Sequence, residues 1–412
     1  MWNDESLMVP NLRKLAAEGA SSKAMTVSNP SITWINHTTL ITGVEPRKHG
    51  VLFNGLLVRQ EGGRPGKIEP WVDKSRLVKV PTLYDIAHQA GLTTAESDWV
   101  AITRPGTIDF SFAELPELES PIVKEMIADG KITPQHVEWM QLGPMRKSVT
   151  FLDNMWTKAA IHMLQKHKPN LLLYHTLNTD ATHHTYGPSS MASFTALAYA
   201  DRLVGDLVKA VEDSGLRDRT TVFISTDHGF KKVTQYVYPN VALKKAGYAK
   251  ALGPTINIGD AFSMTQGGMA FVYVNDPARK TELLPKLKEL LSQTEGVERV
   301  IDGKEGHILG MPTPEENQGM GDLVLYAKPG FAFNNSAAGD AVTAPTVNYG
   351  GTHGYFNGDP ELDGIFIASG RGIKKGVVLD RMANLDVAPT MAEIMGLKLP
   401  QTDGRVLKEI LE

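Results

Sequence analysis

The chain of 412 residues contains no cysteine. This absence excludes disulfide bonds and thiolate ligands, so a bound metal would need histidine, carboxylate or hydroxyl ligands. The sequence also has no uninterrupted apolar run of about 18 residues, the length that a membrane-spanning helix requires. The net charge is only −4 at pH 7, so the basic excess that binds a nucleic acid polymer is missing. We expect neither a transmembrane segment nor a nucleic acid partner.

The apolar fraction of 42% is typical of a globular protein with a large core. Short apolar runs at 170–177, 220–225 and 364–369 are typical of buried strands, and a long helical pattern covers 191–214. This alternation predicts an α/β fold with a doubly wound, mostly parallel sheet flanked by helices. Residues 230–350 break the rhythm and are interpreted as a small α/β insertion. The core is then formed by 1–229 and 351–412.

The stretch 28–43 is the first candidate for chemistry. Asn29-Pro30 ends an extended segment, Ser31 or Thr33 can then open a helix, and Gly43 is placed to end it. A hydroxyl at a helix N-terminus lies beside free backbone N–H groups and the positive end of the helix dipole, which suits a phosphate and an attacking alkoxide. A plain helix cap explains the same pattern, so the rest of the chain must supply partners for the hydroxyl.

Three polar clusters follow predicted core strands, at the edge of the sheet where ligands bind in open α/β folds. Asp180 and His184 are four residues apart and share a helix face, whereas His183 points elsewhere and is interpreted as a bystander. Asp227 and His228 precede a glycine, and His353 lies in Gly350-Gly-Thr-His-Gly354. Each cluster alone could be a cap, a turn or a loop. Together, two aspartates and three histidines suit Zn²⁺ or a similar ion, and five ligands suit two cations that share phosphoryl chemistry.

These motifs carry a resemblance to a known family. In chain order they are Ser31-Ile-Thr33-Trp-Ile-Asn-His37, Thr42-Gly43, His49-Gly50, Asp180-x3-His184-Thr-Tyr-Gly-Pro188, Ser225-Thr-Asp-His-Gly229 and Gly351-Thr-His-Gly354. The set resembles the alkaline phosphatase superfamily and is most similar to its nucleotide pyrophosphatase/phosphodiesterase branch. The match covers nearly the whole chain, and Asp386-Val-Ala-Pro-Thr390 and Asp403-Gly-Arg405 also fit.

The resemblance implies a function and a role for each site residue. It implies hydrolysis of phosphodiester or pyrophosphate bonds in nucleotides or related small diesters, through a phosphothreonine intermediate, with two divalent metal ions, Zn²⁺ by preference. Thr33 matches the nucleophile, which is also a metal ligand, with Ser31 as its competitor. Asn54 matches the asparagine that hydrogen-bonds a phosphoryl oxygen. The residues matching one metal site are Asp180, His184 and His353, and those matching the other are Asp227 and His228. His37 and His49 match positions that shape the loop and receive no catalytic role.

One part of the family pattern is missing. The family has a metal-binding aspartate at the end of a first strand, ahead of the helix that Pro10–Leu15 matches, and here both would lie before Met1. Asp4 is too close to that helix to replace this aspartate. Two interpretations stay open: the chain is truncated, or its second metal site has lost a ligand and binds metal weakly.

Three alternative functions also stay open. The first is a phosphomonoester, phospholipid or phosphonate hydrolase of the same superfamily, the second an inactive truncated relic, and the third a generic α/β binding module. A sulfatase is disfavoured because the C/S-x-P-x-R setting is missing at the nucleophile. Specificity is expected from residues 55–76, 98–150 and 230–350. The resemblance suggests a periplasmic or secreted protein.

Overall fold

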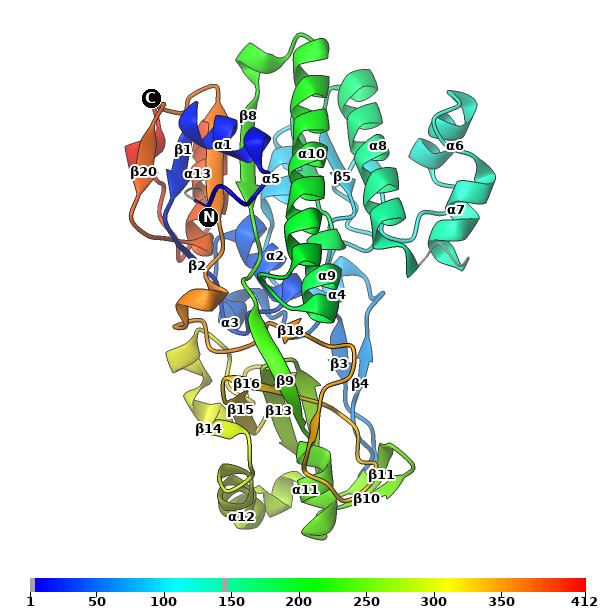
Figure 1. The fold of residues 1–412 in the computed structure, drawn as a ribbon, viewed down its shortest axis with the longest axis vertical. Coiled ribbons are helices and arrows are strands. Elements are labelled where there is room, and N and C mark those ends of the chain that lie inside the picture. The colour runs from blue at the N-terminus through cyan, green and yellow to red at the C-terminus, as the bar shows by residue number, and fades with distance from the viewer. Residues whose placement is uncertain (1–3, 143–146) are drawn as a thin grey trace.

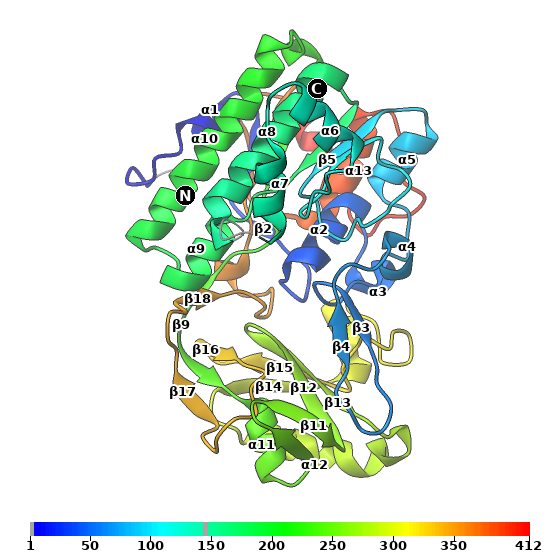
Figure 2. The same cartoon turned by 90° about the vertical axis from the view of Figure 1, so that its right-hand side faces the viewer.

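The computed structural model describes residues 4–142 and 147–412. Residues 1–3, and residues 143–146 within the mostly helical region predicted for 113–167, lie outside the described residues. Figures 1 and 2 show an elongated molecule with two lobes, an upper one rich in long helices and a lower one built mainly from β-structure. Strand β9 (Lys231–Val237) leads from the upper lobe into the lower one. In the described part of the chain no helix has the length and apolarity needed to cross a membrane.

The upper lobe contains two core sheets. In the first, β1 (Ala20–Ser22), β8 (Thr221–Ser225), β19 (Phe366–Gly370) and β20 (Val377–Leu379) lie in the order β20-β1-β19-β8. Strand β19 runs antiparallel to both neighbours, while β1 and β20 are parallel. The second sheet is fully parallel, with β5 (Thr94–Ser97) between β6 (Phe110–Phe112) and β7 (Leu171–Tyr174).

The core is therefore less continuous than the sequence pattern predicts. Strands β7 and β8 were expected in one sheet, but each ends a separate sheet, because within the described residues no strand lies between them to carry the hydrogen bonds. The mostly parallel arrangement holds in the second sheet and only in part of the first. The described residues ahead of α1 (Pro10–Ala17) form no strand, as the sequence indicated.

Helices cover both faces of these sheets (Figure 2). One face carries α1, α8 (Val149–His167) and α10 (Met191–Asp213), of which α8 and α10 lie side by side (Figure 1). The other carries α2 (Thr33–Thr42), α5 (Leu83–Gln89) and α13 (Val387–Ile394). Helices α6 (Pro121–Ala128) and α7 (Pro134–Gln141) lie at the outer edge of the lobe, where Val123 and Phe112 pack against the fully buried Trp156 of α8.

The lower lobe centres on an antiparallel sheet in the order β12-β13-β15-β14. Its strands are β12 (Ala261–Gln266), β13 (Met269–Val274), β14 (Val297–Asp302) and β15 (Leu323–Ala327), covered by α11 (Pro239–Lys245) and α12 (Lys280–Ser292). The remaining strands are β9, β10 (Ala249–Leu252), β11 (Thr255–Gly259), β16 (Gly330–Phe333) and β17 (Thr343–Pro345). All six residues of β13 are buried, which is why Ala270–Val274 forms one continuous apolar run.

The polar excursion at 59–76 joins the lower lobe. Strands β3 (Leu56–Val58) and β4 (Lys67–Glu69) form a hairpin that extends down beside β10 and β11 (Figures 1 and 2). The backbone N–H of Gly259 donates to the carbonyl of Gly63 over 2.9 Å, so the tip of the hairpin is fixed to the insertion. A segment near the start of the chain thereby becomes part of the lower lobe.

Candidate active site

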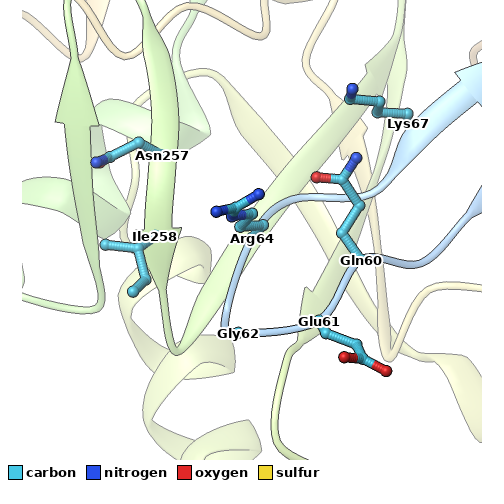
Figure 3. Close-up of a pocket in the computed structure, with 7 residues that line it drawn as sticks. All are labelled: Gln60, Glu61, Gly62, Arg64, Lys67, Asn257 and Ile258. Carbon is cyan, nitrogen blue, oxygen red and sulfur yellow. The ribbon is translucent and has the colours of Figure 1, made fainter.

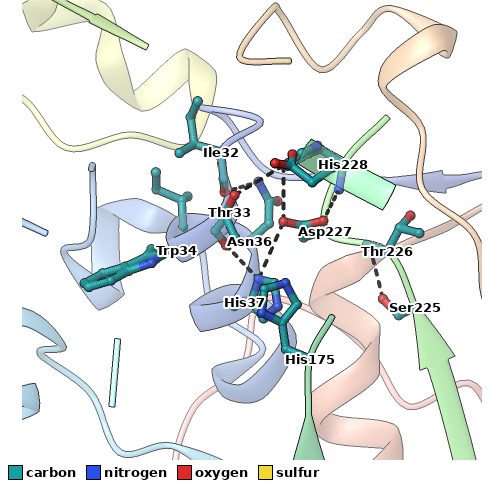
Figure 4. A network of polar contacts seen from close by, with 12 residues as sticks. Ile32, Thr33, Trp34, Asn36, His37, His175, Ser225, Thr226, Asp227 and His228 are labelled. Carbon is teal, nitrogen blue, oxygen red and sulfur yellow. Dashed lines mark hydrogen bonds and ion pairs between the residues drawn. The ribbon is translucent and has the colours of Figure 1, made fainter. Parts of the chain in front are cut away.

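Thr33 is the first residue of α2, and its hydroxyl is free for chemistry. The preceding cap residue is Ile32, which has no side-chain oxygen, and its extended backbone starts the helix without a side-chain cap. Thr33 is partly exposed, and its Oγ1 lies 3.4 Å from Nε2 of His228 (Figure 4). The prediction that a hydroxyl residue opens this helix is confirmed for Thr33.

Ser31, the competing nucleophile, is fully buried and already engaged. Its hydroxyl donates to the carbonyl of Tyr355 over 2.8 Å and accepts from the backbone N–H of Gly354 over 3.0 Å. Both bonds fasten the α2 entry loop to the segment that carries His353. This geometry gives Ser31 a structural task and leaves Thr33 as the hydroxyl that faces the site.

Asn36 holds the entry loop in place from inside α2. It is completely buried, and its Oδ1 accepts from the backbone N–H of Ser28 over 2.7 Å. Its Nδ2 donates to the carbonyls of Pro30 and Ile32 over 3.1 and 3.0 Å. The side chain of Asn384, near the C-terminus, donates to the same Oδ1 over 2.8 Å. The loop before Thr33 is therefore fixed by a buried amide network.

Asn54 lies at the same helix end. Its Oδ1 accepts from the backbone N–H of Trp34, the second residue of α2, over 3.1 Å. The side chain is exposed, so this bond turns its Nδ2 donor toward the space in front of the helix. The residue can thus cap the helix and donate a hydrogen bond to a ligand at once.

Asp180, His184 and His353 form the first ligand cluster. Their ligand atoms all lie within 4.8 Å of one another, with Asp180 3.6 Å from His184 Nε2 and 3.8 Å from His353 Nε2. Nδ1 of His184 lies 3.0 Å from the carbonyl of Gly351, and Nδ1 of His353 lies 2.8 Å from the carbonyl of Ser31. These bonds place a proton on each Nδ1 and leave Nε2 of both rings as a ligand.

The helix that carries Asp180 is positioned from α8. Helix α9 (Asn178–Tyr186) starts where the carboxylate of Asp153 accepts from the backbone N–H groups of Leu177 and Asn178, over 2.9 and 3.1 Å. Burial raises the pKa of Asp180, and its buried Oδ1 has no hydrogen-bond partner among the described residues. Burying a carboxylate oxygen without a partner costs desolvation free energy. A bound cation would offset this cost, so the atom is a good candidate for a metal ligand.

Asp227 and His228 form the second cluster, together with Thr33 (Figure 4). They follow β8 directly, and Asp227 Oδ2 lies 3.2 Å from His228 Nε2. Burial opposes ionisation of Asp227, but the neighbouring charge and hydrogen bond of His228 outweigh it and lower its pKa. Asp227 therefore presents a carboxylate, and Thr33 Oγ1 and His228 Nε2 converge beside it.

Three further polar residues lie behind this cluster; His37 was expected only to shape the loop, and His175 and Asp98 were not singled out. His37, one helical turn after Thr33, has its Nδ1 3.6 Å from Asp227 Oδ2. The ring of His175 packs edge-on against His37 at 4.5 Å, and its Nδ1 lies 3.1 Å from Oδ2 of the buried Asp98. The sequence contains one signal that could have placed His37 near the site. It lies four residues after Thr33, and this spacing puts both side chains on one face of the helix.

The remaining histidines singled out in the sequence lie away from the ligand atoms. His183 packs against Phe230 at 5.1 Å, and burial lowers its pKa to about 4. His49 is fully buried, with Nε2 3.1 Å from Thr39 Oγ1. Asp4 accepts hydrogen bonds from Ser6 on the surface. None of the three contributes to either cluster.

A separate open cavity of about 630 Å³ lies at the tip of the lower lobe (Figure 3). Arg64 and Lys67 of the β3–β4 hairpin face Asn257 and Ile258 of β11 across it. It contains none of the residues discussed above and is open to solvent, so we place the chemistry at Thr33, where the ligand atoms converge.

The donor sets fit divalent metal ions. The first cluster offers one carboxylate and two imidazoles with their outer nitrogens engaged, which is a common arrangement for Zn²⁺. The second offers one carboxylate, one imidazole and the Thr33 hydroxyl. His37, whose Nδ1 lies 3.6 Å from Asp227 Oδ2, is an additional nitrogen beside the second set.

Comparison with known proteins identifies the family. The sequence model for type I phosphodiesterase / nucleotide pyrophosphatase matches residues 4–356, and the chain therefore belongs to this family. It is 21% identical to a venom phosphodiesterase of Macrovipera lebetinus over 97% of this chain and 42% of that protein. It is 22% identical to ectonucleotide pyrophosphatase/phosphodiesterase family member 7 of Rattus norvegicus, over 98% of this chain and 82% of that protein. The chain thus spans less than half the length of the venom enzyme.

Solved structures confirm the fold class. Human ectonucleotide pyrophosphatase/phosphodiesterase 5 superimposes with a TM-score of 0.73 at 15% identity, covering 100% of this chain and 96% of the other. An inactive variant of the murine counterpart, in complex with AMP, gives the same TM-score. The α/β fold with flanking helices, predicted from the sequence, is therefore that of the pyrophosphatase/phosphodiesterase structures.

Proposed function

We propose that this chain hydrolyses phosphodiester or pyrophosphate bonds in nucleotides or related small diesters, with Thr33 as the nucleophile. One observation carries the proposal: Thr33 Oγ1 stands at the head of α2, 3.4 Å from His228 Nε2, beside the two clusters of ligand atoms. Family membership supports the reaction class.

Asp180, His184 and His353 would hold one divalent ion, and Thr33, Asp227 and His228 would hold the other. Imidazole and carboxylate ligands without cysteine suit Zn²⁺. When bound, such ions lower the pKa of a coordinated hydroxyl or water and neutralise charge on the phosphoryl oxygens.

The protein's own groups supply position and hydrogen bonds. Thr33 Oγ1 would attack phosphorus in line with the leaving oxygen, and the phosphothreonine would then be hydrolysed by water. The Trp34 N–H is held by Asn54 Oδ1, so Nδ2 of Asn54 would donate to an equatorial oxygen, where charge develops, and the positive end of the α2 dipole would add to the stabilisation. Asn36 keeps the entry loop rigid, so these groups are aligned before substrate arrives.

The comparisons also suggest a substrate class. The murine neighbour binds AMP, and the relatives are named as phosphodiesterases and nucleotide pyrophosphatases, so we propose a nucleoside monophosphate as one product.

We further propose the division into a core of 1–229 and 351–412 and an insertion of 230–350, with leaving-group specificity in the insertion and the β3–β4 hairpin. Because the relatives are venom and ecto-enzymes, we propose a periplasmic or secreted location.

The decisive experiment replaces Thr33 by alanine and by serine in the full chain. A chromogenic nucleotide diester should be turned over by the wild type and, more slowly, by Thr33→Ser, whereas Thr33→Ala should be inactive while the site of Asp180, His184 and His353 keeps its ion. Near-normal activity of Thr33→Ala would remove Thr33 from its role. Rates on a diester, a monoester and a phosphonate separate this function from the other hydrolases. A wild type with no bound metal would favour an inactive relic.

A further inference from the structure

A second group of metal-ligand side chains lies between α6 and α8, on elements that do not carry the active-site ligands. Glu125 extends from α6, and His162 and His167 extend from the C-terminal half of α8. Nε2 of His162 lies 2.6 Å and Nε2 of His167 lies 2.8 Å from the same oxygen, Oε1 of Glu125. All three ligand atoms are within 4.8 Å of one another.

The two rings are held in this convergent arrangement by their surroundings. His162 is only 5% exposed, at the edge of the core cluster that contains Trp156. The ring of His167 stacks on Phe110, with centroids 4.1 Å apart and planes 20° apart. In this structure both Nε2–H groups donate to the Glu125 carboxylate, so a metal ion would replace these two protons and leave each neutral ring protonated on Nδ1.

The charges around the cluster also suit a cation. His167 is the last residue of α8, where the free carbonyls and the negative end of the helix dipole favour positive charge. In this structure the positive charge comes from Lys166, whose Nζ lies 3.5 Å from Glu125 and 2.7 Å from Asp129. The Lys166 side chain is 42% exposed, so it can swing into solvent when another cation enters. Asp129 Oδ2 lies 4.0 Å from His162 Nε2 and is close enough to become a further ligand.

We propose that Glu125, His162 and His167 bind a divalent transition metal, with Zn²⁺ as the best match, and that this ion fastens α6 to α8. Two imidazoles and a carboxylate select Zn²⁺ over Mg²⁺ or Ca²⁺, which prefer oxygen ligands. Asp129 or water completes a tetrahedron. The site is separate from the active-site clusters, since none of the ligands proposed there lies on α6 or α8.

The test uses the full chain, stripped with a chelator and dialysed against graded Zn²⁺, with bound zinc counted per chain. Glu125→Gln and His167→Gln should each bind one ion fewer than the wild type. His307→Gln, the same change at an exposed histidine of the lower lobe, should bind the wild-type number. Lys166→Gln should bind the additional ion about tenfold more tightly, because it removes a competing positive charge.

A local measurement assigns that ion to this site rather than to the active site. Addition of Zn²⁺ should slow amide hydrogen exchange in residues 121–128 of the wild type and of Lys166→Gln, and should leave it unchanged in His167→Gln. Equal ion counts in the wild type and both ligand variants, with exchange in 121–128 unaffected, would overturn the proposal. The three residues would then be a hydrogen-bonded cluster only. The gain expected for Lys166→Gln cannot result from misfolding, so the test does not depend on the ligand variants alone.

Discussion

The ring of His228 lies flat against the ring of His353, with centroids 3.7 Å apart and planes 13° apart. His228 belongs to one ligand cluster and His353 to the other, so the stack joins the two. It also fixes their spacing, because neither ring can turn without losing contact with the other. Two sites that share in-line phosphoryl chemistry need such a fixed spacing.

Replacement of Asn54 separates its two tasks. Asn54→Asp retains the oxygen that accepts from the Trp34 N–H, so the fold should be kept. It loses the Nδ2 donor and places a negative charge against the phosphoryl group. Asn54→Ala removes the donor without adding a charge, and we expect its kcat on a nucleotide diester to fall about 10²–10³-fold. Asn54→Asp should lose more because of the added charge, and equal activity in all three proteins would contradict this role.

Ser31→Ala tests whether Ser31 is structural. The change leaves the carbonyl of Tyr355 without the hydroxyl that donates to it, whereas the N–H of Gly354 keeps its bond to the backbone carbonyl of Ser31 over 3.0 Å. We expect the free energy of unfolding in urea to fall by about 1–3 kcal/mol. Substrate should still become attached to Thr33, which mass spectrometry of a quenched reaction can locate. Attachment that disappears with Ser31 and persists in Thr33→Ala would reverse the assignment.

Asp180→Asn should remove one ion from the active site. The neutral amide cannot replace the carboxylate that faces His184 and His353. Bound zinc should fall by one per chain, and the thermal midpoint should drop toward that of chelator-treated wild type, because a ligand that binds only the folded state stabilises it. Asp213→Asn, at an exposed position of α10, is the matched control. Unchanged zinc content in Asp180→Asn would show that the ion is held elsewhere.

Glu96 predicts a pH dependence of stability that is unrelated to metal binding. This residue of β5 is 1% exposed, and burial raises its pKa to about 7, although Ser111 and the N–H of Trp99 donate hydrogen bonds to it. A carboxyl whose pKa is higher in the folded state stabilises the fold when protonated. That stability is fully present below the unfolded pKa, near about 4.5, and is lost as the pH rises to about 7.

Glu96→Gln does not titrate, so its unfolding free energy relative to the wild type should rise between about pH 5 and pH 7.5, by at most about 3 kcal/mol. Urea unfolding of both proteins in chelator measures the difference, and groups common to both proteins cancel. The exposed Glu138→Gln should show no such trend. A difference that is flat with pH would mean that Glu96 stays ionised in the folded protein.

The residues proposed as ligands could be singled out from sequence because each is part of a short motif beside a strand or helix end. Asp180 and His184 are one helical turn apart, and Asp227 and His228 follow β8 directly. The short distances in sequence between these residues and the ends of β7 and β8 were enough to place all four at one edge of the core. The same reasoning gave Thr33 as the start of α2, where the free N–H groups of the helix can be inferred from sequence.

Other features depend on contacts that have no local pattern. The separation of β7 from β8 is a matter of strand pairing between distant segments, which periodicity does not encode. Glu125 and His162 are 37 positions apart and meet only because α6 packs on α8. His37 was assigned a loop-shaping role, yet its ring faces Asp227, because the turn after β8 brings that carboxylate over α2.

The buried bond between Asn36 and Asn384 has a consequence for synthesis. The loop before Thr33 is made early, but the amide that holds it is made 348 residues after Asn36, together with β19, β20 and α13. While the ribosome is still adding these segments, the nascent chain holds Thr33 in an unfinished pocket. Thr33 should therefore reach its final position only when these segments have left the ribosome and Asn384 has bonded to Asn36.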